Sequence, residues 1–171
     1  RSKNSQVQIQ RAETGGYLSV KALKNIFLNK FHRENGAKFA PFAGYDMPIN
    51  YKTGIINEHL HVREKIGIFD VSHMGQILIP VNDNNVLALE TYIPLNIKKI
   101  QPNKCHYSFI LNNNGGIIDD IMISKINVNN QENIYIVYNA SRKIILNKIF
   151  SNICDNYTII NNNCLIAIQG P

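Results

Sequence analysis

The spacing of hydrophobic residues divides the first part of the chain into helical and irregular stretches. Apolar side chains recur three or four positions apart between residues 21 and 35, which predicts a helix there. The same spacing predicts a second helix over residues 53–66, with Thr53 as its N-cap, followed by a short strand over residues 68–71. Between the helices, residues 38–51 contain four aromatic residues, two prolines and a glycine, so we expect a shaped loop with extended pieces.

From residue 76 onward, short apolar runs alternate with two amphipathic stretches. The predicted strands are residues 76–81, 106–111, 117–126, 133–139 and 157–160, and the predicted helices are residues 85–93 and 141–153. An Asn-Gly-Gly turn joins the second and third of these strands into a hairpin. This order of elements predicts an antiparallel-rich α/β sandwich of ferredoxin-like type.

The same patterns predict how the chain is divided. Residues 1–20 lack periodicity and are poor in acidic residues, which predicts a disordered leader or the remnant of a mitochondrial targeting segment. We expect residues 21–75 to form the first part of domain 1, residues 76–160 the ferredoxin-like domain 2, and residues 161–171 a strand returning to domain 1. Because the chain starts without Met and ends directly after an apolar run, we expect a fragment of a longer protein.

Composition and charge narrow the classes of partner. The chain of 171 residues carries a net charge of +6, which favours acidic partners. Its basic residues are dispersed and form no block, so nucleic acid is not an expected partner. No apolar run approaches the length of about 18 residues that a membrane-spanning helix needs. The three cysteines show no C-x-x-C spacing and are expected to be reduced thiols.

Two adjacent carboxylates, Asp119 and Asp120, interrupt the apolar strand predicted over residues 117–126. Neighbours in a strand face opposite sides, and both sides of this strand are apolar, so the alternation does not select the buried one. One expectation is that at least one carboxylate points into a pocket or a polar contact, because an unpaired buried carboxylate is costly. Alternatively, both lie at the mouth of the hairpin and accept hydrogen bonds from backbone amides.

Motifs for metal or nucleotide binding are not found. His59 and His61 are two positions apart on a predicted helix, so they do not share a face, and no metal is expected. The sequence contains no P-loop, no G-x-G-x-x-G and no G-x-S-x-G.

Three stretches in order resemble one family: FAGYDMPINY (42–51), FDVSHMGQ (69–76) and NNGGIIDDIMI (113–123). They are similar to the T-protein of the glycine cleavage system, the tetrahydrofolate-dependent aminomethyltransferase. The segments NGAKFAPFAG, HYSFILN, YIVYNAS and LIAIQGP are also similar to that family. The resemblance covers roughly residues 25–171 and only the N-terminal half of such a protein.

The resemblance implies a mixed α+β fold, part of three domains around a channel that holds the folate, with the C-terminal domains missing. It implies transfer of the methylene carbon of an aminomethyl group from the lipoyl arm of a carrier, the H-protein, to tetrahydrofolate, with release of ammonia. The implied partners are the lipoylated H-protein and other glycine cleavage components, without nucleic acid, membrane or metal. For a eukaryotic source the implied location is the mitochondrial matrix. We expect these 171 residues alone to be inactive and poorly stable.

The family's functional residues carry over to five positions. The second aspartate of the G-G-x-x-D-D run is its catalytic residue, which is Asp120 here. Met74, Tyr107 and Asn139 match folate-contacting positions, and Met122 holds a place that lines the same pocket. The carboxylate would act as a general base toward a folate amine nitrogen and would stabilise the positive charge that develops as ammonia leaves.

Three alternatives remain open. One is a folate-binding protein that assists iron–sulfur cluster assembly; such proteins usually lack the intact aspartate pair and the D-V-S-H-M run found here. Another is the folate domain of a sarcosine or dimethylglycine oxidising flavoenzyme. The last is a protein of this fold that binds folate without turnover.

Overall fold

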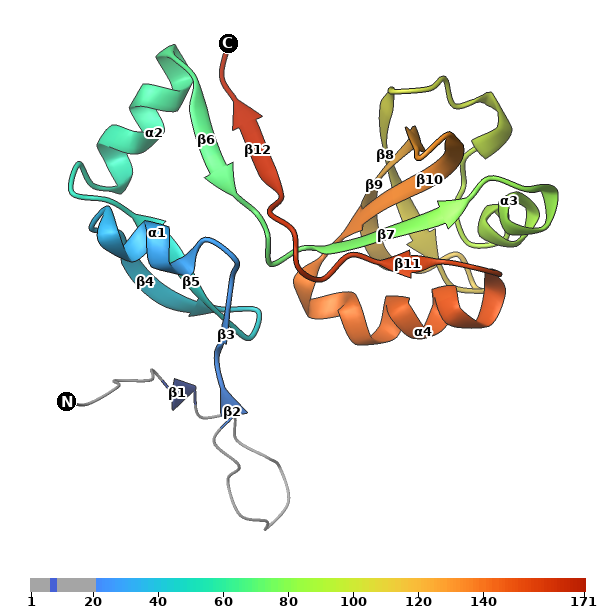
Figure 1. Cartoon of the computed structure of the whole chain (residues 1–171), viewed down its shortest axis with the longest axis horizontal. Coiled ribbons are helices and arrows are strands. Elements are labelled where there is room, and N and C mark those ends of the chain that lie inside the picture. Colours follow the sequence, from blue (N-terminus) through green and yellow to red (C-terminus); the bar gives the residue numbers. More distant parts are fainter. Residues whose placement is uncertain (1–6, 9–20) are drawn as a thin grey trace. The chain divides into compact units, whose positions relative to one another are not determined.

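The computed structural model describes residues 7–8 and 21–171, which belong to two compact units. Unit 1 consists of Arg1–His73 with Asn163–Pro171, and unit 2 consists of Met74–Asn162 (Figure 1). The leader predicted over residues 1–20 lies outside the described residues, apart from the two-residue strand β1 (Val7–Gln8).

Unit 2 contains one five-stranded antiparallel sheet and two α-helices (Figure 1). In chain order its elements are β7 (Gly75–Pro80), α3 (Asp83–Glu90), β8 (Cys105–Leu111), β9 (Ile117–Val128), β10 (Gln131–Tyr138), α4 (Lys143–Ile153) and β11 (Thr158–Ile159), with 3₁₀ turns at Ile97–Lys99 and Ala140–Arg142. The strands lie in the order β11-β7-β10-β9-β8, and every neighbouring pair is antiparallel. The predicted order of strands and helices is confirmed, and the chain is of mixed α+β class.

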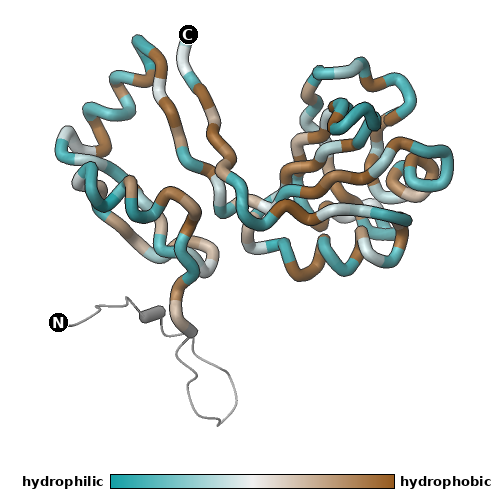
Figure 2. The backbone as a smooth tube through the Cα atoms, in the orientation of Figure 1, coloured by the Kyte–Doolittle hydropathy of each residue, from teal (hydrophilic) through white to brown (hydrophobic). Residues whose placement is uncertain are grey.

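The core of unit 2 lies on one face of this sheet. Alternate residues of β7, β9 and β10 are isoleucines that point to the same side, and β7 is largely hydrophobic (brown in Figure 2). Helix α3 contributes Val86 and Leu89 to this core, and helix α4 contributes Leu146 and Phe150. Both helices therefore cover one face, while the alternate residues of β8, β9 and β10 on the other face, apart from the buried Asn133, stay half-buried or exposed within unit 2. We refer to this second side as the open face.

The hairpin between β8 and β9 is held by the side chain of Asn112. Its Oδ1 accepts hydrogen bonds from the backbone amides of Asn114 and Gly116, both at 2.9 Å. Gly115 has a φ of +76°, a left-handed conformation that glycine adopts without a steric cost. The Asn-Gly-Gly sequence thus produces the predicted turn.

Among the described residues, unit 1 contains three small sheets and two helices, and one of these sheets is the antiparallel pair of Val7–Gln8 with Lys21–Ala22 (Figure 1). Its elements are β2 (Lys21–Ala22), β3 (Lys24–Asn25), α1 (Asn29–Glu34), β4 (Lys38–Phe42), β5 (Tyr45–Asn50), α2 (Ile55–Glu64), β6 (Gly67–Asp70) and β12 (Ile166–Gln169). One sheet has the order β3-β5-β4, and β12 pairs with β6 in antiparallel fashion.

The prediction of a helix over residues 21–35 is wrong for residues 21–28. Only Asn29–Glu34 is helical, as α1. Lys24 and Asn25 instead pair in parallel with Tyr45 and Asp46 of β5. This pairing partner lies some 20 positions along the chain, so the local spacing of apolar residues could not reveal it.

The loop predicted over residues 38–51 is also wrong, because β4 and β5 form a regular hairpin. Ala43 and Gly44 at its turn have φ of 48° and 83°, as two-residue hairpin turns require. Pro41 is tolerated because β4 is an edge strand, and Pro48 lies beyond the two residues that β3 pairs with.

The N-cap of helix α2 lies one residue later than predicted. Gly54 is the N-cap, and the hydroxyl of Thr53 instead donates to Glu58 Oε1 at 2.9 Å. The same Glu58 oxygen accepts the backbone amide of Tyr51 at 2.7 Å. A carboxylate inside the first turn therefore anchors the segment that precedes the helix.

Candidate functional site

The two adjacent aspartates of β9 lie on opposite faces of the sheet of unit 2. Asp119 is only 6% exposed and shares the helix-covered face with Ile121 and Ile123. Asp120 is exposed and shares the open face with Met122. The alternation of a strand therefore gives the two carboxylates different environments.

Asn139 joins the two carboxylates. It directly follows β10, and its side-chain nitrogen Nδ2 donates to Asp119 Oδ1 and to Asp120 Oδ1, each at 2.8 Å. Its backbone amide donates to Asp119 Oδ2 at 3.0 Å. The buried carboxylate thus accepts two hydrogen bonds from one residue, which satisfies its need for partners.

Tyr107 approaches Asp120 from the neighbouring strand β8. Residues 107 and 122 are paired across the ladder, as are residues 109 and 120, so Tyr107 and Asp120 are diagonal neighbours. The pKa of the Tyr107 phenol is raised by partial burial, by the negative charge of Asp120, and by a hydrogen bond to that carboxylate. The phenol is therefore held in its neutral form, in which it donates to Asp120.

The open face next to these groups is aromatic and apolar. Tyr107, Met122, Val137 and Gln76 are paired in one row across strands β8, β9, β10 and β7. Tyr107 and Met122 are 60% and 41% exposed. The rings of Tyr107 and Phe109 pack edge to face, with centroids 5.2 Å apart.

Met74 belongs to the same end of the sheet through its backbone. It precedes Gly75, which pairs with Tyr138, and Asn139 follows Tyr138. All five residues predicted from the sequence are thus in unit 2. Asp120 is hydrogen-bonded to Asn139 and to Tyr107. Met122 is the ladder partner of Tyr107, and the backbone of Met74 lies at the same end of the sheet as Asn139.

Sequence reasoning missed Val137, Gln76 and Tyr135 of the open face. Tyr135 donates its hydroxyl to Gln76 Oε1 at 2.6 Å, and its pKa is raised by burial and by Cys105. The alternation of β10 could have placed two of these three residues on one face. The strand register that makes β7 the neighbour of β10 carries no signal in the sequence.

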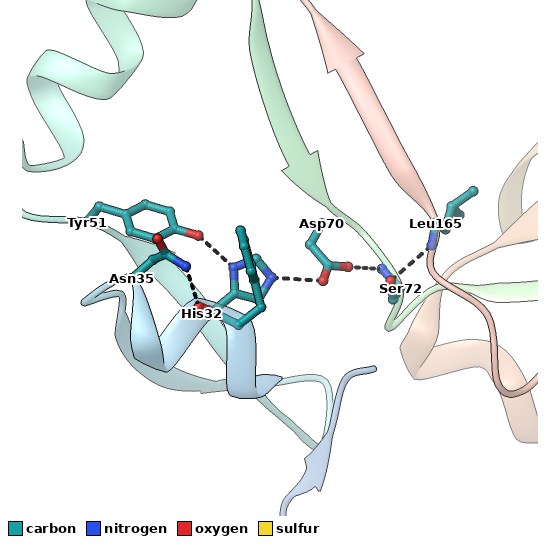
Figure 3. A network of polar contacts seen from close by, with 7 residues as sticks. His32, Asn35, Tyr51, Asp70, Ser72 and Leu165 are labelled. Carbon is teal, nitrogen blue, oxygen red and sulfur yellow. Dashed lines mark hydrogen bonds and ion pairs between the residues drawn. The ribbon is translucent and has the colours of Figure 1, made fainter. Parts of the chain in front are cut away.

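A second polar network lies in unit 1 and also escaped the sequence analysis (Figure 3). His32 Nε2 donates to Asp70 Oδ2 at 2.9 Å, and His32 Nδ1 lies 2.6 Å from the hydroxyl of Tyr51. Asp70 Oδ1 accepts the backbone amide of Ser72, whose hydroxyl in turn accepts the amide of Leu165, both at 2.9 Å. The network links α1, the residue that follows β5, β6 and the segment before β12.

The described residues contain neither a metal-binding cluster nor a membrane-spanning helix. Within residues 7–8 and 21–171, no group of three or more His, Cys, Asp or Glu side chains could hold a metal ion. In the same part of the chain, no helix is long and apolar enough to cross a membrane.

A carboxylate on an aromatic and apolar sheet face can bind an amine or a protonated ring nitrogen and can accept its proton.

Comparison with known proteins identifies similar sequences and folds. The chain is 36% identical over 177 residues to the mitochondrial aminomethyltransferase of Dictyostelium discoideum, covering 95% of this chain and 42% of that protein. It is 40% identical over 157 residues to the aminomethyltransferase of Flavobacterium psychrophilum, covering 87% of this chain and 41% of that protein. The crystal structure of glycine cleavage system aminomethyltransferase T from Bartonella henselae matches with a TM-score of 0.76 and 31% identity, over 88% of this chain and 41% of that one.

The chain thus spans about two fifths of the length of the relatives it matches. Residues 28–171 match the family model described as the GCVT N-terminal domain. The resemblance stated from the sequence motifs is confirmed, and the chain belongs to the GCVT N-terminal domain family.

Proposed function

We propose that this chain supplies the tetrahydrofolate-binding and catalytic carboxylate part of a glycine cleavage aminomethyltransferase. The observation that carries the proposal is the exposed carboxylate of Asp120 on the open face, held by donors from Asn139 and Tyr107. Membership of the GCVT N-terminal domain family supports it, as do the names of the similar proteins.

The donor and acceptor chemistry of the open face fits tetrahydrofolate. The exposed side chains of Tyr107 and Met122 offer apolar surface to a flat ring system. Asp120 offers acceptor oxygens to ring or bridge amines at the edge of that surface. Met74 and Asn139 would complete the contacts at the same end of the sheet.

In the proposed reaction, two amine nitrogens of tetrahydrofolate bond in turn to the transferred carbon, while the bonds of that carbon to the carrier's sulfur and to its amino group break. The two protons lost from the folate amines end on the carrier's thiol and on the ammonia that leaves. The carboxylate of Asp120 accepts a hydrogen bond from one of these amines and takes up its proton, a general-base contribution typically worth about 10²–10⁴-fold. Its negative charge also stabilises the positive charge that develops at the transferred carbon while ammonia leaves. No serine or cysteine nucleophile is needed, because the carbon arrives already activated on the sulfur of the carrier.

The proposed partner is a lipoylated carrier protein, the H-protein, together with other glycine cleavage components. A net charge of +6 favours association with an acidic carrier, and such association should weaken as salt screens the charges. A mitochondrial matrix location is part of the proposal and draws support from the mitochondrial relative in Dictyostelium discoideum.

The test is tetrahydrofolate-dependent release of ammonia from a carrier loaded with the aminomethyl group. It requires the full-length protein that contains this chain, since the similar enzymes are more than twice as long. Asp120→Asn should lower kcat by about 10²–10⁴-fold while folate still binds. Asp155→Asn is the matched control, because Asp155 is an exposed carboxylate of unit 2 whose side chain takes no part in the site, and its kcat should equal that of the parent.

Two results would contradict the proposal. If the parent protein binds tetrahydrofolate but releases no ammonia, a binding or cluster-assembly role replaces it. If the parent is active and Asp120→Asn retains full kcat, the catalytic carboxylate has been assigned to the wrong residue.

A further inference from the structure

Both oxygens of the buried carboxylate of Asp119 accept hydrogen bonds from the same residue, Asn139. Its two oxygens accept the backbone amide and the side-chain Nδ2 of Asn139, at 3.0 and 2.8 Å. It lies on the helix-covered face and is 6% exposed, so it is not itself positioned to meet a ligand on the open face. Its effect on any ligand must therefore pass through Asn139.

Asp119 dictates which way the amide group of Asn139 is turned. A carboxylate only accepts hydrogen bonds, so the atom of Asn139 that faces both aspartates must be the NH₂ group. A flipped amide would set its carbonyl oxygen against two negatively charged carboxylates. Because both N–H groups are committed, the carbonyl Oδ1 is the remaining hydrogen-bonding atom of that side chain.

We propose, resting on the function proposed above, that Asp119 is a positioning residue for the open face. It fixes Asn139 so that Nδ2 holds Asp120 in one orientation and Oδ1 is presented to an N–H donor of the bound ligand. The ligand edge recognised beside Asp120 is consequently a donor edge, an amine or amide N–H, and not an acceptor such as a carbonyl or carboxylate.

Asp119→Asn replaces one of the two acceptor oxygens that face Asn139 by an NH₂ donor, with little change in side-chain volume. An asparagine at position 119 has an acceptor oxygen in place of one carboxylate oxygen and a donor NH₂ group in place of the other, so it cannot accept at both positions from Asn139. The amide of Asn139 must then lose a contact or flip, which turns its NH₂ toward the ligand's own N–H. Misplacement of a reacting group by about 1 Å can cost about 10²-fold in rate.

The first readout is independent of activity. In the full-length protein labelled with ¹⁵N at asparagine, the side-chain amide protons of Asn139 should exchange slowly with water, because both are bound to carboxylates. The signal can be assigned by its disappearance in Asn139→Ser. Asp119→Asn should accelerate this exchange, whereas Asn133→Ala should not, since Asn133 is a buried polar residue at the opposite end of β10.

The second readout separates positioning from stability. Asp119→Asn should lower kcat by about 10²-fold and weaken tetrahydrofolate binding by about 10-fold or more. Asn133→Ala should leave kcat and the affinity for tetrahydrofolate unchanged, whatever its effect on the free energy of unfolding. If Asp119→Asn only destabilises the fold, with kcat, affinity and Asn139 exchange unaltered, the positioning role is refuted. If the parent protein releases no ammonia, the proposed function is refuted. The exchange rates of the Asn139 amide protons then still decide whether Asp119 is a positioning residue.

Discussion

The two units of the chain bury different kinds of side chain. The buried hydrophobic residues of unit 2 form one continuous cluster of isoleucines, with leucine, valine and aromatic partners, against α3 and α4. In unit 1, only Ile26 and Met47 are buried hydrophobic residues among those the structure describes. The remaining buried residues there are polar: His32, Asp46, Asn50 and His73.

This difference predicts different sensitivities to mutation. Apolar burial is not directional, so unit 2 should lose stability in proportion to the volume removed. A buried polar group needs a specific partner, so unit 1 should be sensitive to the loss of single donors or acceptors. Unit 1 also leaves large apolar side chains exposed on α2, β6 and β12, among them Ile56, Leu60, Ile68 and Ile168.

The largest stability effect is expected from the core of unit 2. Ile136→Ala removes a side chain that is fully buried in β10 and should lower the free energy of unfolding by about 2–5 kcal/mol. Ile144→Ala on α4 is the control, since that side chain is 83% exposed and should change stability by less than about 0.5 kcal/mol. Urea unfolding gives both values, and hydrogen exchange assigns the loss to unit 2. Equal losses in the two variants would contradict the placement of the core.

A smaller loss is expected where β7 and β10 approach each other. A Cβ atom at Gly75 would lie 2.1 Å from the ring of Tyr138, which is fully buried and donates its hydroxyl to Asn147. Since that ring cannot move aside, Gly75→Ala should cost about 1–3 kcal/mol. Gly116→Ala would meet only the exposed side chain of Asn112 and should cost less. Thermal unfolding of both variants provides the comparison, and the reverse ranking would show that β7 can shift.

In unit 1 the corresponding test is Asp70→Asn, which leaves the volume almost unchanged. The carboxylate accepts from His32 and from the amide of Ser72, and its side chain is 2% exposed. Losing an acceptor there should cost about 1–3 kcal/mol. Glu34→Gln is the exposed control, and its effect should stay within about 0.5 kcal/mol. If hydrogen exchange in β12 stayed unchanged in Asp70→Asn, the network would not hold that strand in place.

The smallest effect concerns pH. The pKa of Tyr51 is raised by burial and by the charges of Glu58 and Asp70. A tyrosine with a raised pKa in the folded state contributes stability that is fully present below its usual pKa of 10.0 and is lost as pH rises through the folded value. The free energy of unfolding should therefore fall above pH 10 in the parent and fall less in Tyr51→Phe. Urea unfolding between pH 9 and 11 measures this free energy in both proteins. If it falls equally with pH in the parent and in Tyr51→Phe, the loss of stability at alkaline pH belongs to other groups.

The contrast between the units also explains what the sequence could predict. In unit 2, one sheet face is buried and the other is open, so alternation of apolar residues located the strands and the hairpin within a few positions. In unit 1, β3 and β5 pair across some 20 residues, and the buried groups are polar, so no periodic pattern marked them.

For the candidate site, the family resemblance named residues but not the contacts that join them. The family motif singled out Asp120 and Asn139, and the structure joins them by a hydrogen bond. The role of Asp119 depends on two hydrogen bonds from Asn139, which is 20 positions away in the sequence. The sequence around Asp119 gives no sign of this partner. His32 meets Asp70 across 38 positions, and a single histidine on a short helix gives no signal of such a partner.

The pairing of β6 with β12 sets an order of events during synthesis. Residue 68 pairs with residue 168, and the backbone amide of Val71 donates to Leu165, so unit 1 encloses the whole of unit 2 in the sequence. While the ribosome extends the chain, every strand of unit 2 emerges before β12 does. Strand β6, with its exposed Ile68 and Phe69, therefore remains without a sheet partner until residues 166–169 have left the exit tunnel, and in that interval its unpaired edge is open to chaperones.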